Sequence, residues 1–171
     1  MKLLKLIFPI FLLLLIYSCD GGLSPNIEEN IKPGFGGKIT FIGSWNKDIN
    51  LTYIVLFKDP LLTESDFNAN NLKFVSDPIP KGTKEFFYNT IDNKSFGKID
   101  PGQYAYLAVV QSPALILNLT RSSWTVAGIY TDVSNNLPQG KIIVTATEFS
   151  NDVNIVCDFN NPPPQPPGGS K

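Results

Sequence analysis

The sequence predicts an all-β protein, an antiparallel β-sandwich of about seven or eight strands. Two observations carry this prediction. Between positions 37 and 159, runs of β-branched and aromatic residues alternate with clusters of turn-forming residues at intervals of roughly ten residues. The same region has no long apolar stripe with the 3.6-residue period of a helix, although residues 61–71 could form a helical turn or two.

Eight segments have the composition of strands. In chain order they are residues 38–45, 51–58, 72–75, 83–91, 103–111, 124–130, 141–147 and 152–159. The segment 103–111 is apolar on both faces, which predicts a central strand covered on both sides. The step at residues 150–152 predicts a hairpin turn that joins the last two segments.

Alternation within the segments assigns their faces. In the first segment Ile39, Phe41 and Trp45 share one side, and the last segment places Val153, Ile155, Cys157 and Phe159 on one face. We expect a buried, inert thiol at Cys157, because neither a histidine nor a nearby basic residue would stabilise a thiolate there.

The first eighteen residues have the features of a cleaved export signal. Lys2 and Lys5 give a positive start, and an apolar run of twelve residues extends from Leu6 to Tyr17. A membrane-spanning helix needs about 20 residues, and Pro9 weakens this run further. Residues 1–18 therefore indicate a signal peptide.

The residues Ile16-Tyr17-Ser18-Cys19 resemble the lipobox of bacterial lipoproteins. The resemblance implies a diacylglycerol on the Cys19 sulfur and a further acyl chain, such as palmitate, on its amine after cleavage. Two or more chains would hold the protein to a membrane of the bacterial cell envelope. An ordinary secretory signal followed by a chance cysteine is the alternative. Asp20 resembles an inner-membrane retention signal of enteric bacteria, but the membrane and its face stay open.

Composition divides the rest of the chain into three parts. Residues 19–36 comprise the lipidated cysteine and a tether rich in Gly, Pro and Asn, which as a flexible coil would span roughly 20–25 Å. Residues 37–159 form the predicted sandwich. Residues 160–171 are a proline-rich tail, expected as a solvated end or, alternatively, as a ligand for the aromatic groove of a partner.

Charge and composition exclude several classes of function. Removal of Lys2 and Lys5 from the 14 basic residues leaves 12 against 15 acidic ones, and Arg121 is the only arginine. No basic stripe for nucleic acid is present. Histidine is absent, which removes the side chain most used for proton transfer and for transition metals. We expect neither a cofactor nor a metal.

The order of these segments is similar to the prealbumin-like β-sandwiches of carboxypeptidase regulatory domains. The opening Gly37-Lys38-Ile39 and the turn Pro101-Gly102-Gln103-Tyr104 carry the resemblance, which also fits an immunoglobulin-like sandwich. Trp45 and residues 124–130 further resemble lipoproteins of Bacteroidota-like bacteria without an assigned activity. Such domains mostly serve as accessory, adhesive or carbohydrate-associated modules, which implies no catalytic residues here.

Turn carboxylates are the only acid or base groups left. They are scattered singly along the predicted turns, at Asp59, Asp66, Asp77, Asp92, Asp100, Asp132 and Asp152. Such residues usually bind local backbone donors, but a pair flanking one sugar bond would make a polysaccharide-acting hydrolase or accessory enzyme. Calcium is a further alternative, with residues 132–136 and 151–152 as candidates.

An apolar segment after the central strand is the candidate binding site. Leu115, Ile116 and Leu117 are consecutive, so an alternating strand would point at least one of them away from the core. We predict an exposed patch that adds Leu119 and Trp124 to these three, although the segment could instead pack on the core. The sequence thus predicts a lipid-anchored envelope module, without catalysis, whose target is a glycan or another envelope protein.

Overall fold

The computed structural model describes residues 32–94 and 96–169, and the fold they form is all-β, as predicted. Cys19, the expected signal peptide and residues 19–31 of the expected tether lie outside the described residues. The strands are β1 (Gly34–Ile42), β2 (Leu51–Phe57), β3 (Leu72–Val75), β4 (Glu85–Asn89), β5 (Gly102–Tyr104), β6 (Tyr106–Ser112), β7 (Thr125–Ile129), β8 (Ile142–Val144), β9 (Phe149–Ser150) and β10 (Ile155–Asp158). Two short 3-10 helices, η1 (Glu64–Asp66) and η2 (Arg121–Ser123), lie in the connections.

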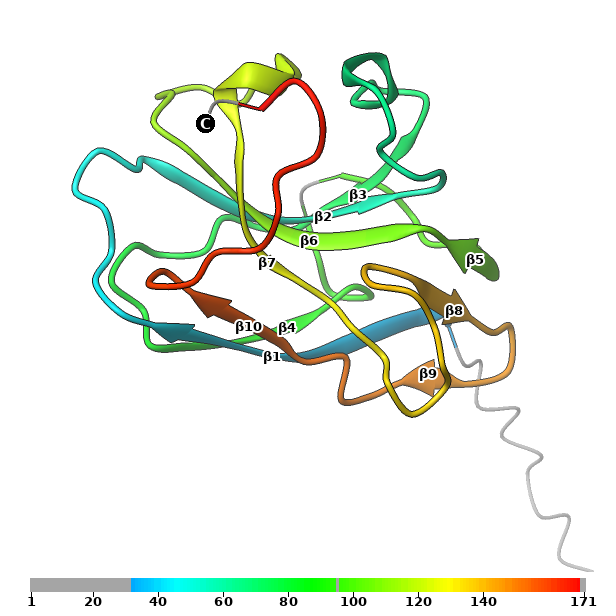
Figure 1. The fold of residues 1–171 in the computed structure, drawn as a ribbon. Coiled ribbons are helices and arrows are strands. Elements are labelled where there is room, and N and C mark those ends of the chain that lie inside the picture. The colour runs from blue at the N-terminus through cyan, green and yellow to red at the C-terminus, as the bar shows by residue number, and fades with distance from the viewer. Residues whose placement is uncertain (1–31, 95, 170–171) are drawn as a thin grey trace, which may run out of the picture. The chain divides into compact units, whose positions relative to one another are not determined.

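Two sheets lie face to face and form a β-sandwich (Figure 1). One sheet has the order β10-β1-β4, with β9 also on β1, and the other has the order β3-β2-β6-β7. The strands β5 and β8 pair with each other in a small additional ribbon. The apolar alternation of the sequence therefore specifies the layers, because each sheet turns one apolar face toward the other.

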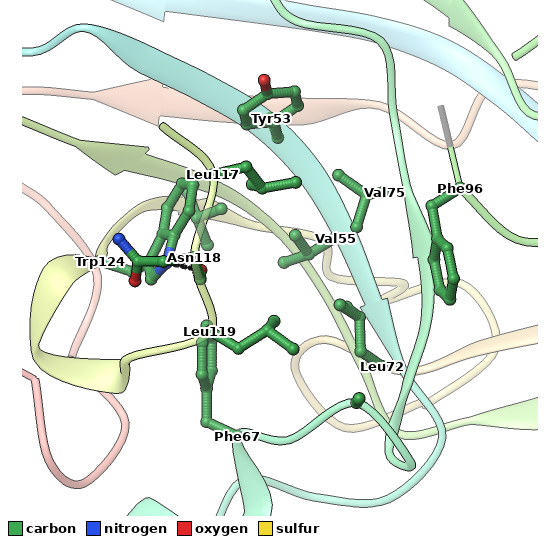
Figure 2. A pocket seen from close by; sticks show the side chains of 12 residues that line it. Tyr53, Val55, Phe67, Leu72, Val75, Phe96, Leu117, Asn118, Leu119 and Trp124 are labelled. Atoms are coloured by element: carbon green, nitrogen blue, oxygen red, sulfur yellow. Dashed lines mark hydrogen bonds between the residues drawn. The ribbon is translucent and has the colours of Figure 1, made fainter. Parts of the chain in front are cut away.

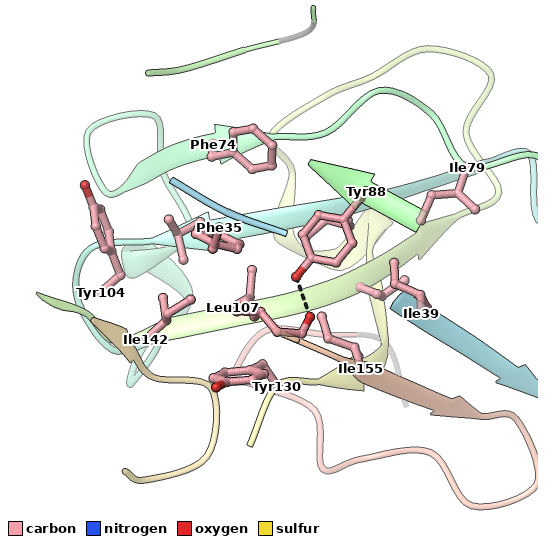
Figure 3. Packing of buried hydrophobic residues seen from close by; sticks show 14 of the residues in the cluster. Phe35, Ile39, Phe74, Ile79, Tyr88, Tyr104, Leu107, Tyr130, Ile142 and Ile155 are labelled. Atoms are coloured by element: carbon pink, nitrogen blue, oxygen red, sulfur yellow. Dashed lines mark hydrogen bonds between the residues drawn. The ribbon is translucent and has the colours of Figure 1, made fainter. Parts of the chain in front are cut away.

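The main core fills the space between the sheets (Figure 3). Phe35 and Ile39 of β1 meet Leu107 of β6 there, and all three side chains are fully buried. The hydroxyl of Tyr88 donates to the Val153 carbonyl oxygen at 2.7 Å, so this buried polar group is satisfied. Burial raises the pKa of Tyr88 far above its ordinary value.

The second sheet is covered on its outer face as well. A second apolar cluster lies there and consists of core residues of β2, β3, β6 and β7 together with Trp124 just before β7, namely Val55, Phe57, Leu72, Val75, Ala108, Val110, Trp124 and Val126. The strand β6 lies between β2 and β7 and is buried on both faces, which confirms the predicted central strand. Loop segments, not a third sheet, cover this outer face.

The pairing of the last strands differs from the predicted hairpin. β8 pairs antiparallel with β5, whereas β9 and β10 both run parallel to β1. The prediction was wrong because alternation specifies the buried face of a strand and not its neighbour. The sandwich is nevertheless rich in antiparallel pairs, as predicted, because β4 pairs antiparallel with β1 and the sheet β3-β2-β6-β7 is antiparallel throughout.

The first strand begins inside the expected tether. β1 starts at Gly34, and Phe35 is a fully buried core residue. A Cβ on Gly36 would lie 2.7 Å from the Tyr88 carbonyl oxygen, so glycine at this position permits a close approach of β4. The glycine at position 36 allows close packing of two strands, whereas the composition of residues 19–36 alone suggested a flexible coil.

Candidate functional site

The predicted binding segment crosses the outer face of the second sheet. It leaves β6 at Ser112, whose hydroxyl accepts from the Ala114 amide at 3.1 Å, and the Asn50 side chain donates to the Pro113 carbonyl at 2.7 Å. Asn118 accepts twice, with its side chain from the Thr120 amide at 2.9 Å and with its carbonyl from the Trp124 indole at 2.8 Å. The segment is therefore an ordered loop held at both ends.

Four of the five predicted patch residues lie at the surface. Leu115 and Ile116 are 82% and 79% exposed, and Leu117 and Leu119 are about half exposed. Trp124 is only 3% exposed, which corrects the expectation that its ring extends the outer surface. The hydrogen bond from its indole turns the ring beneath the loop.

An apolar groove of about 250 Å³ lies between this loop and the sheet (Figure 2). The side chains of Leu117 and Leu119 point from the loop toward β2 and β3 (Figure 2). The groove is lined by Tyr53, Val55, Phe67, Ala69, Leu72, Val75, Phe96, Val110, Leu117, Asn118, Leu119 and Trp124. Every side chain in this lining is uncharged.

Short-range contacts position the aromatic walls. Asp66 caps the start of η1, accepting the backbone amides of Thr63 at 2.7 Å and Leu62 at 2.9 Å, and Phe67 directly follows the helix as its C-cap. The Phe67 ring then packs on Phe57, with 5.3 Å between centroids. These two amide donors also hold the pKa of Asp66 below its ordinary value.

The sequence signalled part of this groove and missed the rest. β2 is apolar on both faces, which indicates a strand covered on both sides and places Tyr53 and Val55 under a cover. Phe67 and Phe96 come from connections outside the named strands, where no periodicity exists to assign a face. The strand residues Tyr53 and Val55 of the groove could therefore be predicted from the sequence, whereas Phe67 and Phe96 could not.

The proline-rich tail packs against the domain behind the groove. Arg121 is 3% exposed, and its guanidinium donates to the Trp124 carbonyl and, at 2.9 Å, to the Pro166 carbonyl. Its charge lies 5.6 Å from the centroid of the Phe67 ring. Burial lowers the pKa of Arg121 from its ordinary value. The expectation of a solvated tail is corrected, because Pro166 in the tail supplies an acceptor that this buried cation needs.

A second, polar cleft of about 530 Å³ lies on the first sheet's side of the domain. It brings together the two candidate calcium segments, since Asp132, Asn135, Asn151 and Asp152 all line it. Asp132 binds its own turn, accepting from Ser134 and Asn135 through side chain and backbone. Within residues 32–94 and 96–169, no cluster of three or more His, Cys, Asp or Glu residues is arranged to hold a metal ion.

Asp132, one of the carboxyl groups that line this cleft, lacks the raised pKa of a general acid. A glycosidase needs one carboxyl group with a raised pKa as its general acid. Hydrogen bonds from Ser134 and then Asn135 instead lower the pKa of Asp132, and they occupy its oxygens. Asp132 is therefore a turn acceptor, as expected for an Asp in a turn.

The thiol expected to be inert is buried. Cys157 lies in β10 with its side chain fully buried, beside Val153 and Ile155 in the main core, which confirms the predicted face. Burial raises the pKa of Cys157 to about 12. Its thiol is thus protonated near neutral pH.

The turn that carries the prealbumin-like resemblance is present in the structure. Asp100, Pro101 and Gly102 lead into β5, and the Tyr104 hydroxyl donates back to the Asp100 carbonyl at 2.7 Å. Over the part of the chain that is described, no helix has the length and apolar character needed to cross a membrane. Comparison of the chain with protein-family models, with curated proteins and with solved structures gives no match in any of the three. The prealbumin-like and lipoprotein resemblances therefore stay predictions.

Proposed function

We propose that this chain is a lipid-anchored binding module of the bacterial cell envelope, without catalysis, and that its target is another envelope protein. The apolar groove carries the second part of the proposal. The lipobox-like residues Ile16 to Cys19 support the first part, because a lipid on Cys19 would keep the domain beside a membrane.

The chemistry of the groove favours an apolar side chain as its occupant. Its volume of about 250 Å³ is below the roughly 300–1,000 Å³ of pockets that take whole small molecules. Transfer of an aliphatic or aromatic side chain into an uncharged pocket is favourable by about 1.5–3 kcal/mol. A groove of this size suits one or two such side chains, which is how hot-spot residues anchor protein interfaces.

Both oxygen atoms of Asn118, a polar residue of the groove lining, are already committed. The Asn118 side-chain oxygen and carbonyl accept from Thr120 and Trp124, respectively. A sugar in the groove would leave its hydroxyl groups without partners, at a cost of several kcal/mol. Leu115 and Ile116 extend the apolar surface beyond the groove, and contiguous exposed apolar surface of this kind marks interaction sites.

Site-specific photocrosslinking in the producing bacterium tests this function. A photoreactive phenylalanine analogue at position 116 should give a discrete protein adduct, and the same analogue at Val156, which is exposed on β10, should not. The groove-filling substitution Ala69→Trp should abolish the adduct, because Ala69 is exposed and lines the groove. Equal adducts at positions 116 and 156, or an adduct that survives Ala69→Trp, would refute the proposal.

A further inference from the structure

The chain leaves the sheet between β9 and β10. Both strands run parallel to β1, and residues 151–154 between them bulge outward. The Val153 amide still donates to the Gly36 carbonyl at 3.0 Å, but the Lys38 amide donates to the Asn154 side chain at 2.7 Å instead of to a strand. Asp152 has a positive φ of 60°, which directs the backbone out of the sheet plane.

This bulge separates two cavities that share its residues. The polar cleft of about 530 Å³ lies on one side, against residues 130–137. A cavity of about 360 Å³ lies on the other side, over Gly36, Gly37 and Lys38 of β1. Asn151, Asp152 and Asn154 line both cavities.

A third cavity continues the series beyond β4. Its volume is about 260 Å³, and it shares Phe87 and Tyr88 with the cavity over β1. Phe87 is 74% exposed, the highest value for any aromatic side chain in the exposed set of large hydrophobic residues. Three neighbouring hollows therefore follow one another from the 130–137 loop, across the bulge, to the outer side of β4. We call this series the polar track.

Three side chains at the centre of the polar track, those of Asn151, Asp152 and Asn154, keep hydrogen-bonding capacity for a ligand. Within the described residues, Asn151 and Asp152 make no side-chain hydrogen bond, and Asn154 uses only its oxygen. Amide groups offer both donors and acceptors, as adjacent hydroxyl groups require. The charge of Lys38 is balanced by Glu85, with 2.9 Å between nitrogen and oxygen.

We propose that the polar track binds a linear, neutral glycan. The exposed Phe87 ring offers a flat apolar face for the C–H side of a sugar ring, and Asn151 and Asp152 offer hydrogen bonds to its hydroxyl groups. The consecutive cavities suit a chain of sugars more than a single one. This site is distinct from the apolar groove, shares no lining residue with it, and does not depend on the protein target proposed for that groove.

Two other ligand classes fit the polar track less well. A nucleic acid or another polyanion would need unbalanced positive charge, whereas Lys38 is paired and Asp152 is negative. An extended peptide would add to a free strand edge through its backbone, and the cavity over β1 offers no such edge, because β1 is paired with β4 on one side and with β10 on the other.

Calorimetric titration of the purified full-length protein tests the proposal. The probes are four neutral oligosaccharides: cellohexaose, maltohexaose, N-acetylchitohexaose and mannohexaose. We expect the protein to bind at least one of them without cleaving it. Phe87→Ala and the double variant Asn151→Ala/Asp152→Ala should each weaken that binding tenfold or more. Phe96→Ala, an exposed phenylalanine of the apolar groove, should leave it unchanged.

Each other outcome overturns the proposal. Absence of binding to all four probes would do so, as would binding that Phe87→Ala leaves intact or that Phe96→Ala weakens equally. Cleavage of a probe would replace a binding site with a hydrolase. Thermal unfolding of each variant verifies folding, and all three substituted side chains of the polar track are exposed, so their midpoints should match the parent protein.

Discussion

The side-chain amide of Gln165 forms two hydrogen bonds with the main chain of Val126. It accepts from the Val126 amide at 2.7 Å and donates to the Val126 carbonyl at 2.9 Å. One side chain thus satisfies the edge of β7 in the way that a neighbouring strand would. Edge strands with unpaired backbone groups are prone to pair with other chains, so the tail protects this edge.

Replacement of Gln165 by alanine should destabilise the protein by roughly 1–3 kcal/mol, because two partly buried hydrogen bonds are lost and the main chain of Val126 loses both of these partners. Urea unfolding measures the free energy, and hydrogen exchange should show faster exchange of the Val126 amide. Gln103→Ala, an exposed glutamine of β5, is the matched control and should change neither. Equal effects of the two substitutions would contradict a specific role for Gln165.

The exposed loop residues should contribute little to stability. We expect the double substitution Ile116→Ser/Leu117→Ser to lower the free energy of unfolding by less than 1 kcal/mol, since these residues are 79% and 49% exposed. Leu107→Ala in the main core should cost about 2–5 kcal/mol. A loss in the double serine variant comparable to that of Leu107→Ala would show that the loop belongs to the core.

Stability should fall in alkaline solution because of Cys157. Its pKa is about 12 in the folded protein, against 9.0 for an exposed thiol, so the unfolded chain ionises first. The contribution of the protonated Cys157 thiol to the free energy of unfolding is fully present below pH 9. It is lost progressively as the pH rises from 9 toward 12. Chemical denaturation across this range should show a shallower decline in Cys157→Ala. The native thiol should also resist alkylation at pH 8 and react after unfolding, and rapid native alkylation would contradict its burial.

Lipid attachment should depend on Cys19. Cys19→Ala should abolish labelling with an alkyne fatty acid and move any exported protein from the membrane to the soluble fraction. Cys157→Ala is the control, since it removes the other cysteine and should leave labelling intact. Persistent labelling of the Cys19→Ala protein would refute the lipobox interpretation while leaving the groove and the polar track untouched.

The sequence predicted which face of each strand is buried better than it predicted which strands pair with each other. The period-2 alternation located β2 and β3 almost to the residue and identified the buried face of Cys157. It did not predict that β10 pairs with β1, because any strand with a compatible apolar face could occupy that position. The hairpin turn expected at residues 150–152 is instead the outward bulge of the polar track.

The candidate sites divide in the same way. Consecutive leucine and isoleucine residues break the alternation, and this break allowed the sequence to predict the exposed loop at 115–119. Trp124 could not be placed, because its burial depends on a hydrogen bond to Asn118 across a loop. The polar track depends on the backbone conformation of residues 151–154, and the tail contact depends on Gln165 meeting β7. Neither has a periodic signal.

The parallel pairing of β1 with β10 also governs when the fold can form. Ile39 is paired with Ile155, so this sheet joins the first strand, β1, to the last strand, β10. Contacts so distant in sequence close large loops, and they slow folding. During synthesis, β1 lacks its parallel partner β10 until residues 155–158 have emerged from the ribosome. The strand that is synthesised last is therefore needed to complete the sheet that the first strand begins.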